Sequence, residues 1–178
     1  MKSSKLFLSI FFIFLCSCSF YSLTGSIPLH LKNVVIQPTI NNTSEYNIGK
    51  HFEKIFTDLL IDKNLLKISN YEKADCQLQF LVKKVYDEPY VIDEARNSTS
   101  VKQWKIDVVL SVDWYDLVNQ TSIINKDVSE SVIYSLNNTS IINQNVDQYE
   151  YVSNREAAIQ KCIENLSNRI INELTSTW

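Results

Sequence analysis

The sequence predicts an α+β fold, a two-layer sandwich in which a four-stranded mixed sheet carries two helices packed on one face, in the order βαβββα. Three patterns predict this fold. Apolar residues alternate strictly over 104–114, as in a strand with one buried face. Apolar residues recur at helical spacing over 48–60 and again over 159–174. These changes of period occur without a repeat or a low-complexity linker, which favours one compact domain.

The first strand and the first helix are expected early in the domain. Residues 34–36 form a β-branched run that Pro38 ends, and the asparagine-rich residues 41–47 are expected to form a loop. The first helical stripe begins directly after Asn47, which we expect to be the N-cap of the helix. The helix should end near Asp62.

The middle of the chain predicts three further strands. Alternation from Cys76 to Val82 indicates a strand with one buried face, and Pro89 either ends this strand or marks it as an edge strand. Residues 104–114 form the clearest strand. Residues 124–134 are expected to pair with it in a long antiparallel hairpin.

The turn of this hairpin is expected at Asn119 and Gln120. Trp104 and Trp114 are expected in the core, because aromatic residues at strict alternation usually pack there. A small additional strand is expected at Ile68.

A capping box predicts where the last helix begins. Ser153 and Glu156 stand three residues apart, and each would satisfy a free backbone donor of the first helical turn. The helix should therefore begin after Ser153. The apolar stripe from Ile159 to Leu174 would then face the sheet.

The first residues have the layout of a secretory signal peptide. Lys2 and Lys5 give a positive start, and residues 6–15 form an apolar run that is too short to span a bilayer, which needs roughly 20 apolar residues. The run leads into residues 15–18 (LCSC), which resemble a lipobox. The sequence therefore predicts an exported bacterial lipoprotein that is held to a membrane by acyl chains on Cys18, an attachment that is effectively permanent.

Processing at this site divides the chain into three parts. These are a removed signal peptide over 1–17, a lipidated amino-terminal arm over 18–30 and a folded domain over 31–178. Ser19 follows the lipidated cysteine, at the position where an Asp would tend to keep such a protein in the inner membrane. We therefore expect an anchor in the outer membrane and a domain that faces the periplasm.

Composition limits the function of the mature chain. Removing 17 residues from 178 leaves 161, which is enough for one domain with a sizeable core. Without Lys2 and Lys5, 15 basic residues face 20 acidic ones, and this net charge of −5 argues against nucleic-acid binding. Gly25 and Gly49 are the only glycines, which excludes the glycine-rich phosphate loops of common nucleotide enzymes.

Two cysteines, Cys76 and Cys162, remain besides the anchor. An oxidising periplasm would permit a disulfide between them. Each lies on an apolar stripe, however, which favours two separate buried thiols that act as small hydrophobic residues.

Residues 20–28 (FYSLTGSIP) resemble the start of the mature lipopolysaccharide-assembly lipoproteins of the LptE family. Three further segments match the pattern of that family: residues 34–38 followed by 41–43, the strand start at 74–75, and the start of the closing helix at 155–159 (REAAI). The resemblance covers essentially the whole mature chain. It departs from the family at Leu23, where an aromatic residue is commoner, and at residues 29–30, where a more polar turn is usual.

The resemblance implies a function as well as the βαβββα sandwich. Members of the family plug a large outer-membrane β-barrel, the translocon protein LptD, and aid the insertion of lipopolysaccharide into the outer leaflet. It implies no enzymatic activity and no cofactor. The partners would be an LptD-like barrel, lipopolysaccharide and, through the anchor, the membrane. The alternative is an independent envelope lipoprotein that binds a small ligand or peptide between the sheet and the helices.

Four lysines are candidates for contact with lipid phosphates. Lys83 and Lys84 lie near the end of one predicted strand, and Lys102 and Lys105 lie at the start of the next, so an antiparallel pair would bring them together. Alternation places Lys83 and Lys84 on opposite faces, and the candidate ligand-binding residues are therefore Lys83, Lys102 and Lys105. Lysines that guard a solvated sheet edge against aggregation would show the same pattern.

Other candidate sites are weaker. Tyr21, Leu23 and Ile27 form an apolar arm that would pack either on a partner barrel or across the domain's own sheet. His30 and His51 have no Cys, Asp or Glu at metal-ligand spacing, and no serine stands in a nucleophile-elbow setting. We expect neither catalytic residues nor a metal site, and a periplasmic hydrolase has no supporting constellation.

Overall fold

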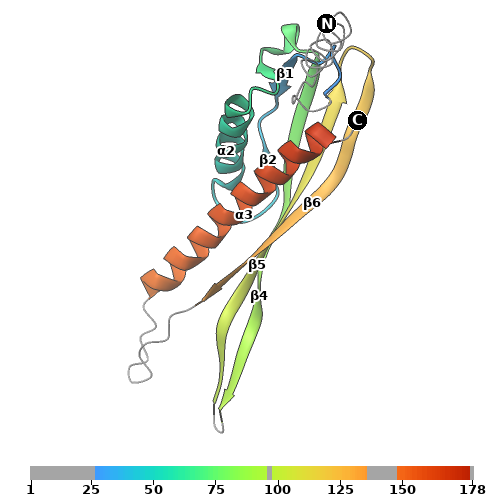
Figure 1. Cartoon of the computed structure of the whole chain (residues 1–178). Coiled ribbons are helices and arrows are strands. Elements are labelled where there is room, and N and C mark those ends of the chain that lie inside the picture. Colours follow the sequence, from blue (N-terminus) through green and yellow to red (C-terminus); the bar gives the residue numbers. More distant parts are fainter. Residues whose placement is uncertain (1–26, 96–97, 136–147, 177–178) are drawn as a thin grey trace, which may run out of the picture.

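The computed structural model describes residues 27–95, 98–135 and 148–176, which form one sheet and two long helices (Figure 1). The elements in chain order are β1 (Asn33–Ile36), β2 (Ile40–Asn41), α2 (Ile48–Asp62), β3 (Lys67–Ile68), the 3-10 helix η2 (Tyr71–Lys73), β4 (Cys76–Ala95), β5 (Ser98–Asp116), β6 (Thr121–Ser135) and α3 (Gln148–Ser176). The predicted α+β fold with two helices on one face of a mixed sheet is confirmed, but the sheet has six strands and not the predicted four, because the two-residue strands β2 and β3 join it. The short strand expected at Ile68 is β3.

The sheet has the strand order β3-β1-β4-β5-β6, and β2 pairs with β4 further along the same edge as β1. β1 runs parallel to both β3 and β4, with α2 in the connection between β1 and β3. β4, β5 and β6 form an antiparallel meander. The predicted hairpin turn at Asn119 and Gln120 is confirmed, and Gln120 has a positive φ of 56° there.

The two helices cover one face of the sheet, and the core lies between them and this face (Figure 1). In β5 the even-numbered residues from Ile106 to Trp114 are all buried, as the alternation predicted. Trp114 is fully buried, whereas Trp104 is only partly buried and packs against the core. No helix among the described residues is long and apolar enough to cross a membrane.

Three phenylalanines join α2 to the sheet. The rings of Phe52 and Phe56 on α2 lie 4.9 and 4.8 Å, respectively, from the ring of Phe80 on β4, and both contacts are edge to face. Such contacts are favourable beyond the area that the rings bury. This cluster therefore determines where α2 sits on the sheet.

β4 does not end at Pro89, as one of the two readings of the sequence had it, but continues to Ala95. Pro89 lies opposite Trp104, with a register shift directly after it. Beyond Val82, where β2 stops pairing, β4 has no second strand partner among the described residues. A missing N–H is tolerated on such an edge strand, so the edge reading was correct. β4 and β5 thus form a long hairpin that projects past the end of β6 (Figure 1).

The expected start of α3 was wrong, whereas Asn47 is the N-cap of α2 as predicted, although without a side-chain hydrogen bond. α3 begins at Gln148 and not after Ser153, so the predicted capping box lies inside the helix. Residues 148–152 contain no Pro or Gly, so nothing in their sequence stops the helix from extending. The Asn154 side chain donates a hydrogen bond to the carbonyl of Ser135. α2 does begin after Asn47, but this residue makes no side-chain cap and has a φ of 61°. Asparagine is used here because it tolerates the left-handed conformation.

Asp116 holds the turn between β5 and β6. Its Oδ1 accepts hydrogen bonds from the backbone N–H groups of Val118 and Asn119, both at 2.9 Å. Its Oδ2 accepts one from the Asn119 amide and lies 2.8 Å from Nε2 of His30. Burial opposes ionisation of Asp116, but these hydrogen bonds outweigh it and lower the pKa of Asp116 to about 2.

Cys76 and Cys162 are both free and buried, so the thiol reading is confirmed. Cys76 begins β4, whereas Cys162 lies on α3 beneath the carbonyls of Ile106 and Glu130. Burial raises the pKa of Cys76 to about 11 and that of Cys162 to about 12. Both side chains therefore act as apolar residues.

Replacing Phe56 by Ala tests the phenylalanine cluster. We expect F56A to lower the free energy of unfolding by about 3–5 kcal/mol, because it leaves a cavity against Phe80. The measurement is urea denaturation. Ile61→Ala is the matched control, since Ile61 is on the same helix but 58 % exposed, and it should change stability by less than about 1 kcal/mol. Equal losses in the two variants would contradict this account of how α2 is placed.

Asp116→Asn tests the turn. Because the pKa of Asp116 lies below its ordinary value of 3.8, its carboxylate stabilises the fold above about pH 4, and this contribution disappears as the pH falls towards 2. D116N should therefore cost about 1–2 kcal/mol at pH 7. The difference from the parent should shrink between pH 4 and pH 2.5 in chemical denaturation. A difference that does not change with pH would rule out the carboxylate as its source. Asp62→Asn, an exposed change, is the control.

Candidate functional site

Arg155 on α3 joins three other elements of the domain. Its guanidinium lies 2.5 Å from Oε1 of Glu45, in the loop before α2, and 2.9 Å from Oδ2 of Asp87 on β4. Tyr134 on β6 donates a hydrogen bond to the other oxygen of Asp87 at 2.8 Å. The hydrogen bonds to Glu45 and Asp87 raise the pKa of Arg155 above its usual value. The planar guanidinium group of an arginine can contact two carboxylates at once, as it does here.

A groove of about 850 Å³ opens beside this junction, between the start of α2 and the amino-terminal half of α3. Ile48, Ile159 and Ile163 supply apolar lining, and Arg155 and His51 supply polar groups. Its size is within the range of sites for small molecules. Because Arg155 is already paired with two carboxylates, the groove does not offer a free cation to a ligand.

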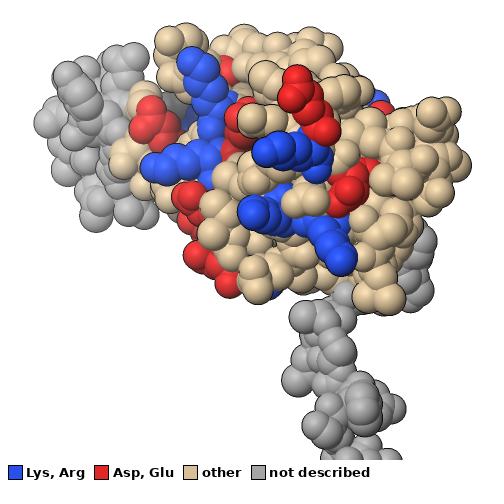
Figure 2. Space-filling view, turned by 90° about the horizontal axis from the view of Figure 1, so that it is seen from above, with Lys and Arg blue, Asp and Glu red and all other residues tan. Residues whose placement is uncertain are grey.

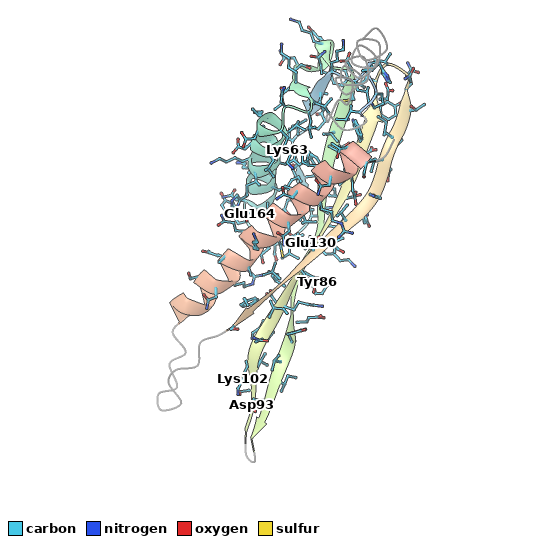
Figure 3. The ribbon with its side chains drawn as sticks, viewed as in Figure 1. Lys63, Tyr86, Asp93, Lys102, Glu130 and Glu164 are labelled. Atoms are coloured by element: carbon cyan, nitrogen blue, oxygen red, sulfur yellow. The ribbon has the colours of Figure 1, made fainter. Side chains whose placement is uncertain are left out.

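The predicted ligand-binding lysines lie along the β4–β5 hairpin and do not form one cluster. Lys83 contacts Asp127 on β6 at 2.7 Å, Lys102 contacts Asp93 at 2.5 Å, and Lys105 contacts Glu88 and Asp107. Figure 3 shows Lys102 and Asp93 together near the tip of the hairpin. The pairing register places Lys105 opposite Glu88, four residues from Lys84. Each predicted lysine is therefore neutralised by a carboxylate, and its ligand role stays a prediction.

The alternation rule failed for Lys83 and Lys84. A register shift between Val82 and Lys84 puts Lys84 opposite Val109, on the face that the helices leave uncovered. Lys83 reaches Asp127 on this same face. A bulge adds one residue to the strand, so two neighbouring side chains can share a face.

The uncovered face of the sheet is polar and only half-exposed. Asp107 is 7 % exposed and accepts a hydrogen bond from Ser131 on the neighbouring strand. Ser111, Asp113 and Tyr115 lie along the same face of β5 and are of intermediate exposure. A face of this kind can exchange hydrogen bonds with a polar partner surface without exposing the core.

Apolar side chains are exposed along β4 where the hairpin projects. We call this the hairpin surface: Tyr86, Tyr90, Val91 and Ile92, which are 46, 54, 37 and 53 % exposed. They fall within seven residues of one strand, and Figure 3 shows Tyr86 where the hairpin leaves the body of the domain. Clustered exposed aromatic and aliphatic residues are typical of protein interfaces.

The structure describes only part of the predicted arm. Cys18, Tyr21 and Leu23 lie outside the described residues. Ile27 is partly buried and packs against the domain's own core, while the role of the arm as a whole stays a prediction. His30, three residues further along the chain, pairs with Asp116 and has a side chain that is 41 % exposed.

The sequence reasoning missed the Arg155 junction and the partner of His30. Arg155 stands four residues before Ile159 on the apolar stripe of α3, and a charge on a buried stripe needs a partner. That signal was available. The sequence did not identify the partners, because Glu45 and Asp87 are far from Arg155 in the sequence and Asp116 is far from His30. The bulges in β4 also change which of its residues share a face.

No protein-family model matches the sequence, and no curated protein sequence matches it. Several solved structures share its fold. Rare lipoprotein B from Shewanella oneidensis superposes with a TM-score of 0.58 at 10% identity, over 82% of this chain and 96% of that one. Lipoprotein B from Nitrosomonas europaea gives a TM-score of 0.51 at 11% identity, over 82% and 83%.

The PelC dodecamer from Paraburkholderia phytofirmans gives a TM-score of 0.52 at 10% identity, over 85% of this chain and 95% of that one. At such low identity these likenesses establish the fold and nothing more. The chain therefore has the α+β fold found in bacterial proteins that carry the name lipoprotein.

Proposed function

We propose that this chain is an outer-membrane lipoprotein that acts without catalysis, as the subunit of a lipopolysaccharide-assembly complex that occupies a large β-barrel of the LptD kind. The lipobox at Cys18 and the fold shared with named lipoproteins support the anchored part of this proposal. The resemblance of residues 20–28 and the later segments to the LptE family supports the assembly role.

The observation that carries the proposal is the one-sided sheet with its projecting hairpin (Figure 1). A wide barrel has a polar interior, and a body that fills it needs polar groups on the side that meets the wall. The uncovered face, with Asp107, Ser111 and Asp113, offers such groups while the core stays behind it. The hairpin surface adds aromatic anchors, which commonly contribute most of the affinity of an interface.

A second candidate function rests on the groove beside Arg155. Its volume of about 850 Å³ and its apolar lining by Ile48 and Ile159 suit a small ligand or a short peptide. An independent envelope lipoprotein of this kind would need no barrel partner.

Affinity purification of the tagged full-length lipoprotein after mild detergent extraction tests the assembly role. We expect mass spectrometry to identify an LptD-like barrel at equal stoichiometry. Y86S/Y90S/I92S should reduce its recovery at least roughly tenfold, because truncated aromatic anchors often cost more than 1 kcal/mol each. I40S/I61S, which changes exposed residues elsewhere, should leave recovery unchanged. Absence of the barrel, with normal surface lipopolysaccharide after depletion of the lipoprotein, would overturn the proposal.

Native mass spectrometry of the purified protein tests the groove. If the second candidate function is correct, a bound small molecule should be retained by the parent and lost in Gln160→Trp, which fills the groove from α3. Lys161→Trp, on the neighbouring position outside this groove, is the control. A parent that carries no adduct, or one that survives in Q160W, would count against this function.

A further inference from the structure

One end of the domain gathers the starts of several strands. β1, β3 and β4 are parallel, so their first residues share this end, and Asn33 lies opposite Lys67 and bonds the N–H of Asp75 at 2.8 Å. β5 ends here too, because Asp116 pairs with Cys76. The described chain also begins at this end, next to the predicted arm (Figure 1).

Four lysines are exposed at this end and have no carboxylate partner. They are Lys32 before β1, Lys63 after α2, Lys67 on β3 and Lys73 on η2. No carboxylate of the described residues lies within 4.0 Å of them, whereas the lysines at 83, 102, 105, 126 and 161 are all ion-paired. Figure 2, which looks onto this end, shows basic side chains near its centre with acidic side chains between and around them.

Exposed apolar residues lie between these lysines. Leu29 is 91 % exposed, Ile68 38 %, Tyr71 59 %, and Val118 in the β5–β6 turn 59 %. We call the eight residues together the anchor-end surface: Leu29, Lys32, Lys63, Lys67, Ile68, Tyr71, Lys73 and Val118. Two exposed carboxylates, Asp62 and Glu72, are also present, and the less exposed carboxylates of Asp75 and Asp116 accept hydrogen bonds from backbone N–H groups. Exposed lysines therefore outnumber exposed carboxylates by two, while the four lysines and the four carboxylates balance in total charge.

Basic residues mixed with aromatic and aliphatic ones are typical of surfaces that lie on a bilayer. Ammonium groups meet lipid phosphates, while tyrosine and leucine side chains enter the headgroup region. A protein partner would favour a larger apolar centre with fewer lysines, because lysine is depleted in protein interfaces. The composition of the anchor-end surface therefore favours anionic phospholipid.

The length of the arm strengthens this choice. Ile27 follows Cys18 by nine residue steps, and at about 3.4 Å per step this segment reaches no further than roughly 30 Å. β4 alone, with 20 residues, extends about 65 Å towards the hairpin tip. A lipid on Cys18 would thus hold the anchor-end surface near the bilayer at every tilt of the domain, which raises its effective concentration there.

We propose that the anchor-end surface rests on the anionic headgroups of the membrane that holds the lipid anchor, so that the hairpin points away from the bilayer. The proposal rests on the lipidation of Cys18 given under the proposed function, and it concerns the lipoprotein before it meets a barrel. In that position the hairpin surface stands in the aqueous space, where a partner can reach it.

Spin labelling of the full-length lipidated protein in vesicles tests the proposal. Asn70→Cys places a nitroxide beside Tyr71, and Tyr90→Cys places one on the hairpin. The native cysteines should not be labelled, because Cys76 and Cys162 are buried and Cys18 would carry the lipid. In vesicles that contain phosphatidylglycerol, we expect the label at 70 to be several-fold less accessible to a water-soluble nickel complex than to oxygen. The label at 90 should stay fully accessible to nickel.

Matched variants separate charge from simple proximity. K32Q/K63Q/K67Q/K73Q should expose the label at 70, since each lysine strengthens attraction to an anionic surface roughly fivefold. K50Q/K54Q/K84Q removes three unpaired lysines outside the surface and should not. Circular dichroism checks that both variants are folded.

The outcomes distinguish the two proposals. If the protein floats with the vesicles but the label at 70 is as accessible as that at 90, the membrane contact is wrong and the anchor stands. Protection at 70 that survives the quadruple change, or that is equal in purely zwitterionic vesicles, also overturns the contact. If the protein does not float at all, the anchoring itself has failed.

Discussion

The two helices pack against one face of the sheet only, and this asymmetry governs the rest of the molecule. The even-numbered residues of β5 and the phenylalanines of α2 lie on the covered face, so the buried apolar core lies on one side of the sheet. The other face is left with polar residues such as Asp113 and Asp107, the second of which accepts a hydrogen bond from Ser131 on the neighbouring strand. β4 and β5 extend beyond both the helices and β6. Their far ends therefore form a two-stranded ribbon whose exposed residues do not pack against the core.

Arg155 holds this arrangement together at the point where the ribbon leaves the body. It ties the loop before α2 to β4 and, through Asp87, to Tyr134 of β6. A partly buried arginine between two carboxylates is costly to separate from either of them, because the remaining charges would lose their partner. The junction therefore specifies the angle between α3 and the hairpin more than it adds to overall stability.

Much of the fold could be predicted because the strongest local patterns agree with it. Alternation located β5 and β6, and helical spacing located α2 and the buried stripe of α3. The failures have local physical causes. The bulge after Val82 put Lys83 and Lys84 on one face, and α3 extended through its capping box. The sequence identified the candidate lysines of the site. It did not identify their carboxylate partners or the salt bridges of Arg155, because these depend on contacts between segments that are distant in the sequence.

The two buried thiols have a consequence for the chain's history in the cell. With a pKa of about 11, roughly one Cys76 side chain in ten thousand would be a thiolate at neutral pH, and Cys162 still fewer. Exchange with disulfides requires a thiolate that solvent can reach. The two thiols of the folded domain are thus inert towards disulfide exchange, and a cross-link between them must form while the chain is still unfolded. Rapid folding, and not a reductase, would keep this protein in its thiol form.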